Sequence, residues 1–206
     1  ADGRFIYPLR WRITAVDSAG TVRRLEGDLT PSTADSLRAG EFLSGTLELP
    51  IPAGRWRVGV AVFQPDERRG GAIQARRVEL DSAARSMSDL FLGRGDDAVR
   101  WHDIPINPLG TWRRGSTMSV YAELRGAPAG TPLTTLIEVR QLDRASGRPL
   151  VRVSTDGTSD GPFTPLRREV DLRALRPGTY RLSVEVRTPD GLVGSRSRDF
   201  EVVPAP

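Results

Sequence analysis

The sequence has no cysteine, no lysine and a single histidine. The lack of cysteine and the scarcity of histidine exclude particular kinds of site. Without cysteine the chain cannot form disulfides, thiolate metal sites or a cysteine nucleophile. Without a second histidine, a transition-metal site would need carboxylates for all its remaining ligands. The lack of cysteine does not identify the compartment, because many exported bacterial proteins also have none.

Long hydrophobic runs are also missing, although 38% of the 206 residues are hydrophobic and 27% are charged, as in a globular protein. No apolar run approaches the roughly 18 residues that a membrane-spanning helix needs. We therefore expect no membrane span. The first residues, Ala1-Asp2-Gly3, include no methionine, which suits a segment processed or excised from a longer chain.

An excess of one charge is absent from both halves of the chain. All 30 basic residues are arginine, against 26 acidic residues, which gives a net charge of +4. When the sequence is divided at Gly95, each half has two more bases than acids, and arginines alternate with acids throughout. Nucleic-acid-binding proteins concentrate their bases in a patch or stripe. We expect no nucleic-acid partner, despite a pI of about 10.4.

What the sequence does have is a repeat of thirteen residues, GRWRVGVAVFQPD at 54–66 and GTYRLSVEVRTPD at 178–190. Apolar or aromatic residues stand at every second position in both, which places them on one face of an extended strand. A Pro-Asp turn follows each strand, and a returning strand follows the turn, at Gln74–Leu80 or Arg196–Val203. Each copy therefore predicts a β-hairpin.

The likeness continues upstream of the hairpins. Trp11 and Ile13, before the turn at Asp17, correspond to Ile137 and Val139, before the turn at Asp143. In the same way 47–49 (Leu-Glu-Leu) corresponds to 170–172 (Val-Asp-Leu). Several short strands at regular spacing, repeated twice, are typical of tandem β-sandwiches.

We therefore predict an all-β chain of two immunoglobulin-like sandwiches, with repeat 1 at 1–81, an interdomain connection at 82–103 and repeat 2 at 104–206. Within the connection, 87–92 (MSDLFL) is apolar enough to pack against a sheet. The strongest helical candidate is Ser32–Ala39, of one or two turns.

The two copies differ at their starts. Before its Ile137 strand the second copy has an alternating strand at Thr117–Leu124, whereas the first has only Ala1–Pro8 in that place. The first sandwich is thus predicted to lack its N-terminal strand or strands. Either the chain is a fragment of a longer protein, or a partner or a second copy of the chain supplies a strand through the open sheet edge.

Several short motifs follow one another in a particular order: SMSDL, NP, GTW, YAEL and PGTYR, beginning at Ser86, Asn107, Gly110, Tyr121 and Pro177. In this order the region from Ile51 to the end resembles the C-terminal part of bacterial proteins named for a GWxTD domain. The GWxTD motif itself is absent, so nothing attributed to that domain carries over. The resemblance implies a C-terminal pair of immunoglobulin-like sandwiches in a larger, exported bacterial protein, and it supplies no catalytic residues.

Candidates for chemistry are few. His102 stands beside Asp103, but no serine lies in a Gly-x-Ser-x-Gly turn, and a Ser-His-Asp triad is not expected. Asp96, Asp97 and Asp103 do not follow the spacing of a calcium loop, and a solvated turn is the favoured interpretation. We expect no catalytic residue, no metal and no cofactor.

The four tryptophans have two interpretations. Trp11 and Trp56 share a face with aliphatic neighbours, which favours core packing. Trp101 and Trp112 flank the connection, and they are the candidate ligand contacts if a surface aromatic binds a sugar. The sequence therefore predicts a non-catalytic structural or protein-binding module, located outside the cytoplasm, with a carbohydrate-binding accessory module as the alternative.

Overall fold

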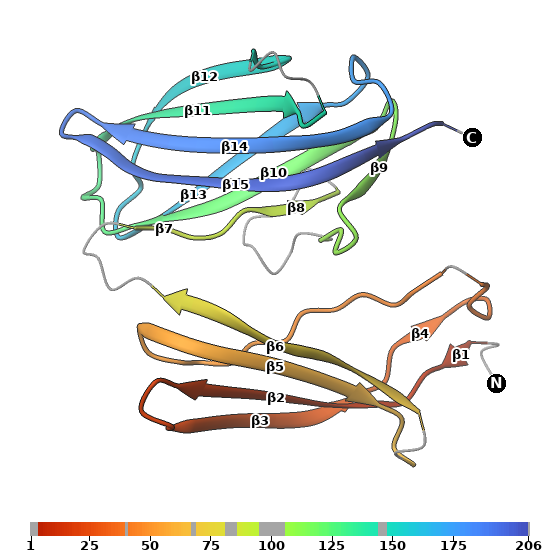
Figure 1. The fold of residues 1–206 in the computed structure, drawn as a ribbon. Coiled ribbons are helices and arrows are strands. Elements are labelled where there is room, and N and C mark those ends of the chain that lie inside the picture. The colour runs from red at the N-terminus through yellow and green to blue at the C-terminus, as the bar shows by residue number, and fades with distance from the viewer. Residues whose placement is uncertain are drawn as a thin grey trace. The chain divides into compact units, whose positions relative to one another are not determined.

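A computed structural model describes residues 4–39, 41–66, 69–80, 86–94, 106–143 and 148–205. These residues form strands, turns and irregular segments and contain no helix, which confirms the all-β prediction (Figure 1). The chain divides into two compact units, Ala1–Ser82 and Ala83–Pro206.

The first unit is built around one antiparallel sheet of four strands. These are β2 (Leu9–Asp17), β3 (Val22–Leu29), β5 (Gly54–Phe63) and β6 (Gly70–Leu80), in the order β3-β2-β5-β6. A separate short pair joins β1 (Phe5–Ile6) to β4 (Ser32–Thr33). The residues between β4 and β5 that the structure describes form no strand.

The second unit is a two-layer sandwich (Figure 1). One layer pairs β10 (Thr117–Arg125) with β13 (Phe163–Asp171) and with the short β7 (Ser86–Met87) and β8 (Phe91–Gly93). The other layer has the order β12-β11-β14-β15-β9, with β9 parallel to β15. Its strands are β12 (Val151–Thr158), β11 (Pro132–Gln141), β14 (Gly178–Thr188), β15 (Gly191–Val203) and β9 (Thr111–Arg113).

A single hydrophobic core fills the space between these two layers. Met118 and Leu124 of β10 and Leu182 and Val186 of β14 are each completely buried. The alternation seen in the sequence explains this burial, because every second side chain of a strand points to the same face of its sheet, here toward the core between the layers. The second unit therefore buries both inner faces with its own residues.

The order β3-β2-β5-β6 of the first sheet repeats the order β12-β11-β14-β15 of the second unit. The register agrees as well: Asp17 pairs with Trp56, as Gln141 pairs with Tyr180. Ile13 is therefore the structural equivalent of Ile137. The sequence alignment, which matched Trp11 with Ile137, was wrong by two residues. The alignment was drawn to the similar turns at Asp17 and Asp143, but β2 ends at Asp17 whereas β11 ends at Gln141.

The first unit lacks strands of its twin, as predicted, and the missing part is larger than an opening strand. Within the described residues it has no equivalent of β7, β8, β10 or β13. The segment 47–49, expected to match the end of β13, lies in the strandless segment before β5. In the second unit β13 pairs with β10 alone. A first unit without a β10 offers that segment no ladder partner.

Two other predictions need correction. The segment predicted as part of an interdomain connection, 82–103, contains β7 and β8, which pair with β10 and belong to the second unit. Its apolar side chains explain this, because Met87, Leu90 and Leu92 are 3%, 3% and 0% exposed in the core. The helical candidate at Ser32–Ala39 also forms no helix, since Ser32 and Thr33 form β4 and the residues after them are turn and irregular backbone.

Candidate functional site

The candidate site is one face of the first sheet, which we call the inner face. Residues directly opposite one another in an antiparallel ladder point to the same side. The registers Trp11–Val62, Ile13–Val60 and Ala15–Val58 therefore place three central pairs together on this side. Neighbouring strands extend the same face with Leu25 on β3 and Ile73, Arg76, Val78 and Leu80 on β6.

The opposite, outer face is charged. Three cross-strand ion pairs cover it: Arg10–Asp28 at 3.1 Å, Arg12–Glu26 at 3.0 Å and Arg55–Glu79 at 3.1 Å. These side chains are solvent-exposed to a large degree, and such pairs each contribute little to stability. The first sheet thus separates an apolar side from a charged side in the manner of a sandwich layer.

The inner face of the first sheet is less covered than its equivalent in the second unit. Val62 is half-buried where its equivalent Val186 is 0% exposed. Leu80 is 36% exposed where Val202 is 1% exposed, and Ile73 on the same strand is 60% exposed. Only Ile13, Ala15 and Trp56 are fully buried hydrophobic residues among the described part of this unit. The face keeps the apolar side chains of a sandwich layer, and its centre is buried, but within the described residues no second sheet packs on it.

In the second unit, two arginines and a glycine of β15 hold the covering segment in place. Arg198 donates a hydrogen bond to the carbonyl oxygen of Leu90 at 2.9 Å, and Arg196 donates to that of Met87 at 2.7 Å. A Cβ atom at Gly194 would lie 2.8 Å from the Cβ of Met87. The β7–β8 segment therefore lies directly against β15, and the glycine permits the close approach.

The first sheet has equivalents of this glycine and of one of the arginines. Gly71 pairs with Val62 as Gly194 pairs with Val186, and Arg76 pairs with Val58 as Arg198 pairs with Leu182. A Cβ atom at Gly71 would meet nothing within 4 Å. Arg76 is exposed, and within the described part of the chain no hydrogen bond or ion pair involves it.

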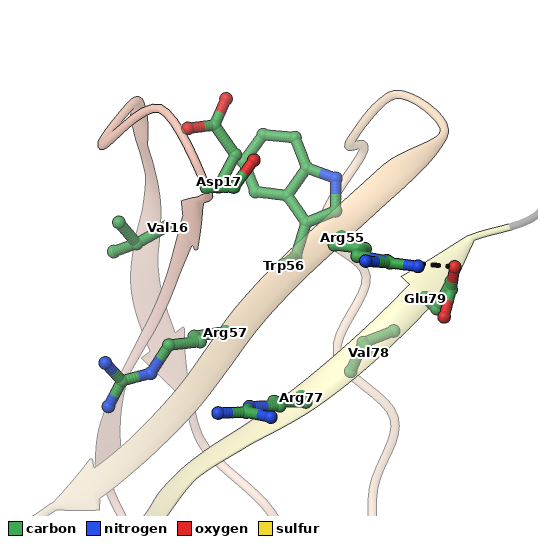
Figure 2. A pocket seen from close by; sticks show the side chains of 9 residues that line it. Val16, Asp17, Arg55, Trp56, Arg57, Arg77, Val78 and Glu79 are labelled. Atoms are coloured by element: carbon green, nitrogen blue, oxygen red, sulfur yellow. Dashed lines mark hydrogen bonds and ion pairs between the residues drawn. The ribbon is translucent and has the colours of Figure 1, made fainter.

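A pocket of about 460 Å³ lies at one end of the first sheet, near the turn after β2 (Figure 2). Its lining residues are Val16, Asp17, Ser18, Arg55, Trp56, Arg57, Arg77, Val78 and Glu79. Arg57 and Arg77 stand directly opposite each other on β5 and β6, an arrangement that places like charges side by side. Figure 2 shows the Arg55 side chain turned instead toward Glu79.

The acidic groups of this pocket already have partners. The carboxylate of Asp17 accepts hydrogen bonds from the backbone N–H groups of Thr21 at 2.7 Å and Ala19 at 2.9 Å. These bonds, that from Thr21 above all, lower the pKa of Asp17 below its usual value, because they stabilise the ionised form. Asp17 therefore serves the turn, and it is not placed as a general acid or base.

Most of the predicted chemical candidates fall outside the described residues. These are Trp101, His102, Asp103, Asp96 and Asp97. The described residues contain no group of three or more histidine and acidic side chains that could hold a metal ion. Among them there is also no helix long and apolar enough to cross a lipid bilayer.

Trp112 is the one predicted ligand contact that the structure describes, and the prediction was wrong. It is 1% exposed and packs edge-on against Phe200, with ring centroids 5.9 Å apart and planes at 88°. Its position on β9, beside the buried end of β15, places it in the core. Of the tryptophans predicted to be in the core, Trp56 is 4% exposed, and Trp11 is half-buried on the inner face.

Sequence reasoning missed Gly71 and Arg76. The signal was present, because both returning strands contain a glycine followed by an arginine, at 71 and 76 and at 194 and 198. The spacing differs by one residue because the β5–β6 ladder is irregular between Val58 and Val60. A bulge of this kind shifts an alignment drawn by simple alternation.

No protein-family model and no curated protein sequence matches this chain. A Pseudomonas fluorescens alkylpurine DNA glycosylase, bound to DNA containing an abasic site analog, is 18% identical over 58% of this chain and 30% of its own, with a TM-score of 0.36. A tetra-tandem repeat in the extending region of a large adhesion protein is 14% identical over 96% of this chain and 42% of its own, with a TM-score of 0.32. This chain therefore spans less than half the length of either structure, and neither similarity identifies a function.

Proposed function

We propose that this chain is a non-catalytic, protein-binding module of a larger exported bacterial protein. In this proposal the second unit is a structural support and the first unit carries the binding surface, its inner face. The partner is another protein or a second copy of the chain. The resemblance to the C-terminal part of GWxTD-domain proteins supports the bacterial and extracytoplasmic setting of the proposal.

The observation that carries the proposal is the contrast between two equivalent faces. Both sheets have the same strand order, but the positions that are closed in the second unit are open in the first, as at Leu80 and Val202, with exposures of 36% and 1%. Large contiguous exposed apolar patches, especially ones with a polar rim, mark protein interaction surfaces. Leu80 and Ile73 extend an apolar row that begins at the buried residues Ile13 and Trp56.

A cross-linking experiment tests this function. A photo-reactive amino acid replaces Ile73, which is 60% exposed on the inner face, and the full chain is irradiated in the organism that encodes it. The matched control carries the same amino acid in place of Leu192, which is 57% exposed in the second unit. We expect a heavier protein adduct from position 73 and none from position 192.

The mass of the adduct identifies the partner as another protein or as a second copy of the chain, and both support the proposal. Equal labelling from the two positions contradicts it, because it indicates collision with exposed apolar groups in general. Cross-links formed only within a single chain also contradict it.

A further inference from the structure

Two of the three features that hold β7–β8 in the second unit have equivalents in the first unit, whose described residues contain no such segment. Gly194 accommodates Met87, and Arg198 binds the carbonyl oxygen of Leu90. Their equivalents, Gly71 and Arg76, stand on β6 at the edge of the inner face. Gly71 has open space above it, and Arg76 is exposed.

Each feature favours an extended chain over a flat protein surface. A glycine on a strand lets another backbone approach more closely than any side chain would permit. An arginine farther along the same face of the strand offers N–H donors to a backbone carbonyl, a group that an extended segment presents at regular intervals. The pair therefore selects for the backbone of a strand as well as for apolar side chains.

We infer that the inner face of the first sheet binds an extended segment of a partner protein in the position that β7–β8 occupies in the second unit. One apolar side chain of the segment lies over Gly71, and a backbone carbonyl three residues later accepts a hydrogen bond from Arg76. This inference rests on the proposed function and specifies its ligand.

The second unit also indicates the sequence that such a segment needs. In β7–β8 the buried side chains are Met87, Leu90 and Leu92, whereas Asp89 between them is exposed. A partner segment is thus expected to have apolar residues at a first, fourth and sixth position. Polar residues fit at the second and third positions, as Ser88 and Asp89 do in the second unit, whereas the fifth position corresponds to the half-buried Phe91.

The absence of cysteine from the chain permits a direct test by disulfide trapping. A single cysteine is introduced as Gly71→Cys in the full chain. The probe is a synthetic peptide of residues 86–94 (SMSDLFLGR) with Met87→Cys. The Cβ positions at Gly194 and Met87 in the second unit would be 2.8 Å apart, and a small shift brings such a pair to the Cβ separation of about 3.8 Å that a disulfide requires. Equilibrium exchange in a glutathione buffer gives the yield of adduct.

Two matched controls make the yield specific. Ala72→Cys places the thiol on the adjacent residue, which pairs with Ala61 and points to the outer face. A second peptide carries Leu90→Asn and Leu92→Asn. We expect the adduct constant of Gly71→Cys with the first peptide to exceed both controls by about tenfold or more.

Arg76→Ala in the Gly71→Cys background is expected to lower the adduct constant by about tenfold, because it removes a charge-assisted hydrogen bond. Arg77→Ala, on the neighbouring residue of the other face, is expected to leave it unchanged. Equal yields at positions 71 and 72, or a yield insensitive to Arg76→Ala, overturn the inference. A partner cross-linked from position 73 together with such a result leaves the proposed function intact and rejects this binding mode alone.

Discussion

Trp56 and Tyr180 lie at equivalent positions and make the same hydrogen bond. The indole N–H of Trp56 donates to the carbonyl oxygen of Pro52 at 2.9 Å, and the hydroxyl of Tyr180 donates to that of Arg176 at 2.6 Å. Each partner is four residues earlier in the chain. Sandwich domains use a tyrosine in this way to fix the corner where the chain enters a central strand. The first unit keeps the corner with a different aromatic residue, although its described residues form no second layer.

The corner predicts the effect of Tyr180→Phe. This change removes the hydroxyl and leaves the carbonyl of Arg176 without its donor, while the ring stays in the core beside Phe200. We expect the free energy of unfolding to fall by about 1–2 kcal/mol with an unchanged denaturant slope. Urea denaturation followed by circular dichroism measures it. A variant as stable as the parent would mean that the hydrogen bond contributes nothing to the corner.

The two equivalent glycines predict opposite outcomes for the same substitution. Gly194→Ala forces a Cβ atom to within 2.8 Å of Met87, whereas Gly71→Ala meets nothing within 4 Å. We expect Gly194→Ala to cost about 1–3 kcal/mol through overpacking. Gly71→Ala is expected to be neutral or to stabilise by up to about 1 kcal/mol, because it restricts the unfolded chain. Thermal or urea unfolding of the two variants side by side checks this, and equal destabilisation would refute it.

Because Trp112 is buried, we expect its substitution to lower the stability of the fold and not to affect binding of a surface ligand. Trp112→Ala removes a side chain that is 1% exposed and is expected to cost about 3–5 kcal/mol. Trp112→Phe is expected to cost much less. It keeps an aromatic contact with Phe200 and removes an indole N–H that has no acceptor among the described residues. Unfolding in urea distinguishes the two variants, and similar costs for both would contradict the burial argument.

The ion pair of Asp199 and Arg181 predicts a dependence of stability on pH. The guanidinium of Arg181 contacts both carboxylate oxygens, at 2.6 and 2.9 Å, and its hydrogen bonds lower the pKa of Asp199 below its usual value. A carboxylate with a lowered pKa stabilises the fold fully above its unfolded-state pKa of about 3.9, and this contribution is lost as the pH falls toward the folded-state pKa.

Asp199→Asn should therefore be less stable than the parent by a constant amount above about pH 5, and this difference should shrink below about pH 4. Urea titrations at several pH values above 5 and below 4 measure it, and the carboxyl carbon resonance of Asp199 gives the pKa directly. A difference that grows on acidification would contradict the assignment.

Much of the fold could be predicted from alternation and turn residues alone. The strand predicted at Thr117–Leu124 agrees with β10 to within one residue, and the alternating segments of the two thirteen-residue copies form β5 and β14. These elements are determined locally, because every second side chain is apolar and a Gly or Asp turn bounds them. The repeated hairpin was predicted for the same reason.

What the sequence could not predict depends on pairing between distant segments. The residues 47–49 resemble the end of β13, but a strand needs a ladder partner, and no equivalent of β10 is present among the described residues. Similarly, the sequence around Trp112 did not indicate whether this residue is buried. It lies in the core because β9 pairs in parallel with β15. The candidate site was missed because the role of Gly71 and Arg76 is inferred from the contacts that their equivalents, Gly194 and Arg198, make with Met87 and Leu90.

The arginine contacts of the second unit predict that β7–β8 can be loosened without unfolding the sandwich. Arg198 and Arg196 bind the carbonyls of Leu90 and Met87. The segment also forms two short ladders with β10 and buries Met87, Leu90 and Leu92 in the core, so removing one arginine weakens its attachment without removing it. Arg198→Ala should therefore raise local opening of this segment, and hydrogen exchange followed by mass spectrometry should show faster exchange of peptides covering 86–93.

Exchange in β11 and β14 should remain at the parent rate, because those strands pair with each other and not with β7–β8. Arg181→Ala provides the matched control, since Arg181 lies on the opposite face of the same sheet and binds Asp199. It should leave 86–93 protected. If Arg198→Ala changed exchange in all strands equally, or left 86–93 as protected as before, the arginine would not be the group that holds the segment. In that case Arg76 could not be assigned the equivalent role in the first unit.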